Sequence, residues 1–224
     1  MCNLYSITRG QAAIRELTRA MRDLTGNLPP MPGVFPDHAA PIVRTGQDGT
    51  RELVTARWGM PSPAFALEGR KVDRGVTNIR NVGSPHWRRW TGEAHRCVVP
   101  FTSFSENDND SSGKAVPVWF AFDDTRPLAV FAGLWTTWTS VRKLAEGEVT
   151  CDLYGFLTTE PNAEVGAIHP KAMPVILTEP DEIETWLTAP WNEARKLQRP
   201  LPDGALRIVG RGSKSDDSGS LPAS

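Results

Sequence analysis

The sequence predicts one α+β domain, in which many strands form the core and a few helices lie around it. The 224 residues are 39% hydrophobic and 23% charged, which is typical of a globular protein with a sizeable core. The 19 glycines and 19 prolines indicate many turns and disfavour an all-helical bundle. Segments rich in β-branched and aromatic residues, separated by turn clusters, account for most of the chain and indicate strands.

Helices are expected in three places. Apolar residues at helical spacing predict the first helix over residues 11–24, and Thr8 with Gln11 fits a capping box before it. A proline in the first turn predicts a short helix over 161–168 and a further helix from residue 180. These helices are expected at the periphery because they are few and short beside the strands.

Strands are expected at eight places: residues 42–44, 53–58, 96–104, 116–122, 128–135, 149–158, 173–177 and 206–209. A segment rich in proline, glycine and aspartate predicts a long ordered loop over 28–41. From Lys214 onward the composition falls to serine, aspartate and glycine. We therefore expect a domain over 1–212 and a disordered tail over 213–224.

Composition also excludes several classes of protein. The formal net charge of −1 excludes a protein that coats nucleic acid through a generally basic surface, but it does not exclude a local basic face. Three cysteines are too few, and odd in number, for a disulfide framework. The first residues lack the features of a signal peptide, and no apolar run reaches the length of a membrane span. We therefore expect a cytoplasmic protein that uses no membrane.

Residues 70–96 form a basic segment in a chain that is otherwise acidic. Seven basic residues stand there against Asp73 and Glu93, so the segment carries +5 and the remainder −6. Trp87 and Trp90 lie among the arginines, and cations interleaved with aromatic rings suit a platform for single-stranded nucleic acid. The alternative is a solvated face whose tryptophans turn into the core.

Cys2 is the most informative position for chemistry. Removal of Met1 would leave a cysteine with a free α-amine, and both the amine and the thiol have nucleophilic forms accessible near neutral pH. Such an aminothiol attacks an aldehyde twice, first through the amine and then through the thiol, and closes a thiazolidine ring. It also suits an N-terminal nucleophile hydrolase, in which the amine serves as the base. A Met-Cys start can equally occur by accident.

Three further positions carry candidate chemistry, each with a plainer alternative. His169 follows a predicted helix and is either a general acid or base or a helix-terminal cap. Glu106 ends an apolar strand and is either a proton donor with a raised pKa or a solvated strand-end residue. Asn78 and Arg80 could hold a sugar oxygen and a phosphate, although this short pattern is nonspecific. No metal-binding, phosphate-loop or serine-hydrolase motif is present in the sequence.

Four separated pieces of the chain, in this order, resemble the SRAP family, whose members are SOS response-associated peptidases or abasic-site processing proteins. The pieces are Met1-Cys2, Thr77-Asn78-Ile79-Arg80, the run from Arg96-Cys97-Val98-Val99-Pro100 to Phe104-Ser105-Glu106, and the run from Thr158-Thr159 through Asn162 and Ile168-His169 to Met173-Pro174-Val175-Ile176-Leu177. The order and spacing of the pieces, which are more specific than any single piece, extend the likeness over residues 1 to about 212.

The resemblance implies a β-barrel-like core of mixed and antiparallel sheet with peripheral helices. It also implies autocatalytic removal of Met1 and covalent capture of abasic sites in single-stranded DNA, with lyase activity as an accompaniment and without a cofactor. Cys2 would be the nucleophile that forms the thiazolidine. Asn78 would hold the linkage, and Glu106 and His169 would transfer protons.

The DNA contacts that the resemblance implies are basic. Arg80 would bind a phosphate next to the captured site, with Arg88, Arg89, Lys171 and Arg211 contributing to the same DNA-binding face. The expected partner is single-stranded DNA that contains abasic sites. We expect a monomer that needs no metal and no obligate protein partner, and that associates with the nucleoid when it is bound to DNA.

Two other functions stay open at the level of sequence. An N-terminal cysteine hydrolase would act on peptides or small amides through the same residue. A noncatalytic single-strand binder would use only the arginines and tryptophans of the basic segment.

Overall fold

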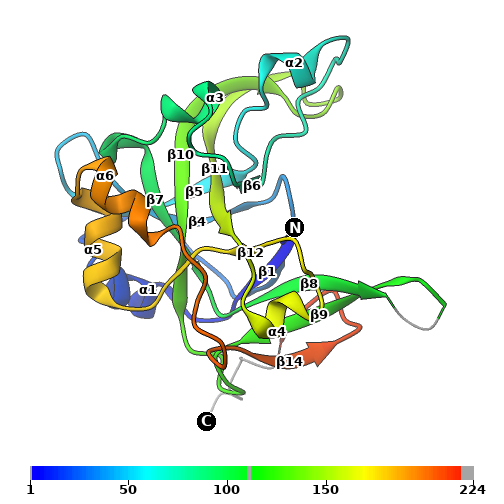
Figure 1. Cartoon of the computed structure of the whole chain (residues 1–224). Coiled ribbons are helices and arrows are strands. Elements are labelled where there is room, and N and C mark those ends of the chain that lie inside the picture. Colours follow the sequence, from blue (N-terminus) through cyan, green and yellow to red (C-terminus); the bar gives the residue numbers. More distant parts are fainter. Residues whose placement is uncertain (1, 110–111, 218–224) are drawn as a thin grey trace.

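Five strands close into a barrel in the computed structural model, which describes residues 2–109 and 112–217 (Figure 1). They are β4 (Ala39–Thr45), β5 (Arg51–Trp58), β7 (Arg96–Phe101), β10 (Ala129–Val141) and β11 (Glu148–Thr159). Antiparallel pairing runs from β11 through β10, β7 and β4 to β5, and parallel pairing of β5 with β11 closes the ring. Closure leaves no free edge on these strands, and it confirms the predicted α+β fold with a barrel of mixed sheet.

A second sheet of five strands lies against one end of the barrel (Figure 1). Its order is β14 (Arg207–Arg211), β9 (Ala115–Ala121), β8 (Ser103–Asn109), β1 (Leu4–Ile7) and β3 (Met31–Val34). β7 and β8 were predicted as one strand, but the chain leaves the barrel at Thr102, whose backbone N–H donates to the carbonyl oxygen of Ser6 at 2.7 Å. The second sheet therefore places the first residues of the chain between β8 and β3.

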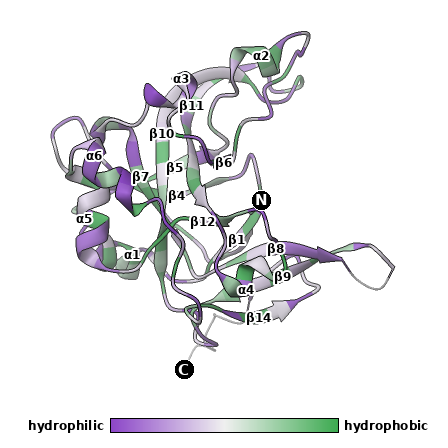
Figure 2. Ribbon diagram, viewed as in Figure 1, coloured by the Kyte–Doolittle hydropathy of each residue, from purple (hydrophilic) through white to green (hydrophobic). Residues whose placement is uncertain are grey.

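The remaining elements are short and lie outside the barrel. The strands are β2 (Arg22–Asp23), β6 (Asn78–Ile79), β12 (Met173–Pro174) and β13 (Ile176–Leu177). The helices are α1 (Gln11–Thr18), α2 (Ala64–Leu67), α3 (Pro85–Arg88), α4 (Ala163–Gly166), α5 (Pro180–Thr188) and α6 (Trp191–Ala194), with 3-10 turns η1 (Glu93–His95) and η2 (Arg195–Leu197). Figure 2 shows apolar residues along the barrel strands and hydrophilic ones on many of the outer loops.

The core is built largely from aromatic rings inside the barrel. Tyr5 enters from β1 and contacts Trp58, Phe131 and Phe156, with ring centres 5.1, 5.8 and 6.1 Å away. All four residues are fully buried. The hydroxyl groups of Tyr5 and Tyr154 share a hydrogen bond of 2.5 Å, which satisfies both polar atoms inside the core.

The first helix is shorter than predicted, and its predicted cap is wrong. It ends at Thr18 because Arg19 adopts a left-handed conformation (φ 55°), after which the chain pairs with β5 as β2. Met21, an apolar residue of the predicted helix over 11–24, therefore lies beyond the helix and is exposed. Gly10 occupies the cap position, and the Gln11 side chain instead donates to Asp23 at 2.8 Å, so a distant partner replaces the predicted capping box.

The other departures come from strand pairing that the sequence does not display. The predicted loop over 28–41 contains β3 and the first residues of β4. The predicted strand over 173–177 is divided into β12 and β13 because the chain changes partner at Val175. The Val175 N–H donates to the Leu157 carbonyl on β11 at 2.8 Å, and its carbonyl oxygen accepts from the Ala132 N–H on β10 at 3.0 Å. The short helix near 161–168 is confirmed as α4, capped by the side chain of Asn162.

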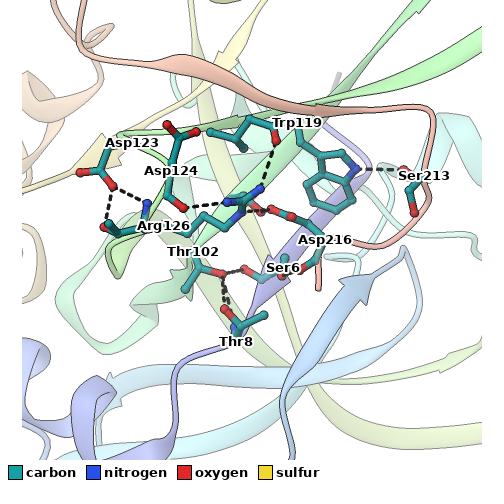
Figure 3. A network of polar contacts seen from close by, with 12 residues as sticks. Ser6, Thr8, Thr102, Trp119, Asp123, Asp124, Arg126, Ser213 and Asp216 are labelled. Carbon is teal, nitrogen blue, oxygen red and sulfur yellow. Dashed lines mark hydrogen bonds and ion pairs between the residues drawn. The ribbon is translucent and has the colours of Figure 1, made fainter. Parts of the chain in front are cut away.

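Residues 213–217, which we call the C-terminal latch, belong to the fold although they were predicted to be disordered. Asp216 is buried, and its carboxylate accepts from Arg126 Nε at 2.7 Å (Figure 3). The same carboxylate accepts from Ser103 Oγ at 2.6 Å. Its carbonyl oxygen accepts from Ser6 Oγ at 3.2 Å. Gly33 admits the latch, because a Cβ there would lie 2.9 Å from the Lys214 carbonyl oxygen. The rest of the predicted tail, residues 218–224, lies outside the described residues.

We expect Asp216→Ala to destabilise the protein. The change leaves the Arg126 guanidinium buried without its carboxylate, a loss that costs about 3–5 kcal/mol in comparable buried pairs. Urea denaturation measures the free energy of unfolding of each variant. Asp217→Ala, which removes a neighbouring exposed carboxylate, is the control and should change stability by less than about 0.5 kcal/mol. Equal effects of the two variants would show that the latch does not stabilise the fold.

Candidate active site

Cys2 lies at the start of β1 and is completely buried. The antiparallel register pairs Leu4 with Ser105, so the residues just before β1 lie beside the residues just after Ser105 on β8. The Cys2 thiol donates to the Leu4 carbonyl at 3.5 Å. Burial raises the pKa of this thiol far above its ordinary value, and the negative charge of Glu106 raises it further. The thiol is therefore neutral at physiological pH.

The side chain of Asn78 contacts the backbone of Cys2. β6 pairs in parallel with β11, and this pairing places Asn78 opposite Phe156 at the end of the barrel. The Asn78 side chain donates from Nδ2 to the Cys2 carbonyl oxygen at 2.8 Å and to Thr77 Oγ1 at 2.8 Å. The structure thus brings together two predicted site residues that are 76 positions apart in the chain.

Asn3 and Thr77 also belong to this cluster, although the sequence analysis assigned neither a role. The Thr77 hydroxyl donates to Asn3 Oδ1 at 3.1 Å, and Asn78 Nδ2 approaches the same oxygen at 3.4 Å. Each flanks a predicted site residue, and Thr77 also begins one of the four pieces that resemble the SRAP family. Their contacts tie the segment before β1 to the segment before β6.

Glu106 lies on β8, one residue beyond the pairing partner of Leu4. It stands two residues after Phe104, so it shares the face of the strand that Phe104 presents to the core. Only 3% of it is exposed, and burial raises the pKa of its carboxyl group to about 7. Both the acid and its conjugate base are therefore populated at neutral pH, as a proton-transfer group requires.

His169 follows α4 and is half-buried, and its backbone N–H donates to the Val165 carbonyl at 2.7 Å. Burial lowers the pKa of its imidazole, and the positive charge of Lys171 lowers it further. The side chain is thus mainly neutral at pH 7 and able to accept a proton. Lys171, two residues on, is exposed.

Two of the predicted DNA-binding arginines lie on elements that are linked to this cluster by strand pairing. Arg80 directly follows β6, is half exposed and forms a 3.4 Å ion pair with the exposed Glu160. Arg211 on β14 lies opposite Val118 on β9, which in turn lies opposite Glu106. Arg211 therefore belongs to the same row as Glu106, two strands away, and it pairs with Asp108 at 3.0 Å.

Arg88 and Arg89 are exposed at the end of α3, but the tryptophans beside them are not. Trp87 and Trp90 are only 7% and 4% exposed, with ring centres 5.8 Å apart. The two tryptophans therefore turn into the core, as in the alternative interpretation of the basic segment, and they do not form a stacking platform. Arg96, the last cation of the basic segment, is also buried.

No group of three or more metal-ligating side chains gathers within residues 2–109 and 112–217. None of the helices in the same described ranges has the length and apolar composition of a membrane-spanning helix.

Comparison with known proteins gives a family match and several similar structures. A family described as SOS response associated peptidase (SRAP) matches residues 1–210. A crystal structure of a protein from Bordetella bronchiseptica is 26% identical, with a TM-score of 0.69 over 94% of this chain and 98% of the other. A protein from Bacteroides thetaiotaomicron is 22% identical, with a TM-score of 0.70 over 99% and 100%. A phage-related protein from Bordetella bronchiseptica is 19% identical, with a TM-score of 0.68 over 92% of each chain. No curated protein matches the chain.

The raised pKa of Glu106 makes stability depend on pH in a defined direction. A carboxyl group whose pKa rises from about 4.3 in the unfolded chain to about 7 in the folded one stabilises the fold at low pH. That contribution is lost as the pH rises through about 7. Glu106→Gln cannot ionise, so its stability relative to the natural protein should increase by roughly 3 kcal/mol at most between about pH 5 and about pH 8.

Urea unfolding at the two pH values measures this difference. Glu160→Gln is the matched control, because Glu160 is exposed and the pKa of its carboxyl group is lowered by a hydrogen bond from the backbone and one from Thr159. The stability of Glu160→Gln relative to the natural protein should stay nearly constant, with at most a slight fall, over the same pH range. A pH-independent difference for Glu106→Gln would contradict the assignment of a raised pKa.

Proposed function

Because the chain belongs to the SOS response associated peptidase (SRAP) family, we propose that it captures abasic sites in single-stranded DNA covalently through Cys2. The observation that carries the proposal is the hydrogen bond from Asn78 Nδ2 to the Cys2 carbonyl oxygen, which holds the nucleophilic residue next to the buried Glu106. The site thus unites a rigid N-terminal cysteine with a carboxyl group that can gain or lose a proton at neutral pH.

The proposed chemistry begins with hydrolysis of the Met1–Cys2 peptide bond, which consumes one water molecule and frees the α-amine of Cys2. The amine then adds to the aldehyde carbon of the ring-opened abasic sugar, and loss of water gives an imine. Next the thiol sulfur attacks the imine carbon, forming a C–S bond while the thiol proton passes to the nitrogen. The product is a thiazolidine, and no oxidant or reductant is needed.

The buried environment of the thiol supports this order of steps. Burial keeps the Cys2 thiol neutral, so the amine is the better first nucleophile and the thiol closes the ring afterwards. Glu106 supplies a proton to the departing hydroxyl group in the dehydration step, for which a pKa of about 7 is well matched. His169, with its lowered pKa, acts as the complementary base.

Asn78 is assigned to hold the linkage. Its Nδ2 is engaged by Cys2 and Thr77, whereas its buried Oδ1 accepts no hydrogen bond from the residues that the structure describes. A buried acceptor of this kind favours a donor on the ligand, such as a sugar hydroxyl or the ring N–H of the thiazolidine. Arg80, which directly follows β6, is assigned to the neighbouring phosphate.

We expect the natural protein to lack the mass of Met1 and to form a covalent adduct with DNA. The first is measured by intact mass spectrometry. The second is measured by incubating the protein with a single-stranded oligonucleotide that carries one abasic site and separating the products on a denaturing gel. Cys2→Ala should abolish the shifted band, because the sulfur that closes the ring is removed.

The same experiment separates the other two candidate functions. Retention of Met1 in an inactive protein would contradict both cysteine mechanisms. Turnover of peptides or small amides without an adduct would support a hydrolase. Noncovalent binding that is equal in the natural protein and in Cys2→Ala, with no covalent band from either, would support a passive single-strand binder.

Arg80→Ala should weaken noncovalent binding of single-stranded DNA and reduce its salt dependence. One lost phosphate contact should lower the magnitude of the slope of log K against log[salt] by about 0.7. Fluorescence anisotropy at several salt concentrations measures the slope, with Arg207→Ala as the control because this exposed arginine lies on β14 beside Asp124. An unchanged slope for Arg80→Ala would remove Arg80 from the DNA contacts.

A further inference from the structure

A groove lies between the segment that follows Arg80 and the segment around α6. Its volume is about 560 Å³, and Val82 and Gly83 form one wall. The other walls include Arg88, Trp191 and Arg195. We call this feature the α6 groove. It is large enough to hold a nucleotide-sized ligand.

Hydrogen bonds join the groove to the active-site elements. Gln198, which lines it, donates from Nε2 to the Arg80 carbonyl oxygen at 2.8 Å and to the Thr158 carbonyl oxygen at 3.0 Å. Thr158 belongs to β11, the strand that positions Asn78 through β6. The α6 groove therefore has a fixed place relative to Asn78 and continues the surface that begins at Arg80.

The charge of the groove favours an anion. Arg88 and Arg195 are both exposed, and neither forms an ion pair with a residue in the described part of the chain. By contrast, the neighbouring Lys196 and Arg199 are paired with Glu193 and Glu182. Two arginines that face one groove without a carboxylate partner provide the donors that phosphate groups prefer.

An aromatic ring completes the groove. Trp191 is half-buried and packs edge-on against the buried Trp186, with ring centres 6.0 Å apart and an interplanar angle of 66°. This contact fixes the ring while leaving part of it at the groove. An indole that lines the same groove as two arginines can stack a nucleobase while the arginines bind the adjoining phosphates, which is the usual arrangement for single-stranded nucleic acid.

We infer that the α6 groove binds the part of the single strand that flanks the captured nucleotide on one side. This inference rests on the proposed function for its choice of partner, because DNA held at Asn78 and Arg80 is continuous with the groove. Trp191 stacks one base, and Arg88 and Arg195 bind phosphates. Trp191 thus has the base-stacking role that the sequence suggested for Trp87 and Trp90, which lie about a hundred positions earlier in the chain.

Binding of undamaged single-stranded DNA tests the groove without requiring capture. At low salt, Arg195→Ala should raise Kd about threefold to tenfold and lower the magnitude of the salt slope by about 0.7. Trp191→Leu should raise Kd by about tenfold, whereas Trp191→Phe, which keeps a ring, should retain most of the affinity. Arg207→Ala removes the same charge outside the groove and should leave Kd unchanged.

Oligonucleotides that carry one abasic site and are shortened on either its 5′ side or its 3′ side show which flank the groove holds. Shortening the strand on one side should weaken binding by the natural protein and abolish the difference between it and Arg195→Ala. Shortening on the other side should preserve that difference. Equal Kd values for Arg195→Ala and Arg207→Ala, or a defect that persists whichever side is shortened, would overturn the inference.

The outcomes for the groove and for the proposed function are distinct. An Arg195→Ala defect without any covalent adduct in the natural protein would refute capture and leave the groove as a single-strand site. Normal adduct formation with unaltered DNA affinity in Arg195→Ala and Trp191→Leu would refute the groove and leave capture standing.

Discussion

β1 has a backbone partner on each side, β8 and β3, although it consists of the first residues of the chain. Leu4, Tyr5 and Ser6 are buried, so their backbone groups need partners within the protein and cannot rely on water. The ladders supply these partners and prevent the fraying that is common at chain ends. Cys2 is fixed beside Glu106 for this reason. The C-terminal latch bonds to the same two strands, through Ser6 on β1 and Ser103 on β8.

β11 links the barrel to the site. One part of this strand pairs with β5 and closes the barrel, and a later part pairs with β6. Barrel closure and the position of Asn78 therefore depend on the same strand. Gln198 bonds to Thr158 near the end of β11, so the α6 groove takes its position from this strand too. A rigid strand shared by three features favours a preorganised site.

Elements that depend on neighbouring residues could be predicted from the sequence, whereas elements that depend on distant residues could not. Turn clusters and β-branched residues located most barrel strands, because strand propensity and turn chemistry are properties of neighbouring residues. The first helix was predicted too long, since Arg19 leaves the helical conformation where the chain begins to pair with β5. The latch was missed for a similar reason: the partner of Asp216 is Arg126, ninety positions away.

The sequence by itself determined the α+β class and the family resemblance. It also predicted Cys2 as the reactive residue, because the amine and the thiol of a cysteine belong to that residue alone. It also located the basic segment, but not which of its side chains reach the surface. Only the tertiary structure decided that Trp87, Trp90 and Arg96 are buried and that Trp191 and Arg88 line one groove. Burial and contact between distant segments arise when strands pair and the barrel closes, and no local pattern in the chain records them.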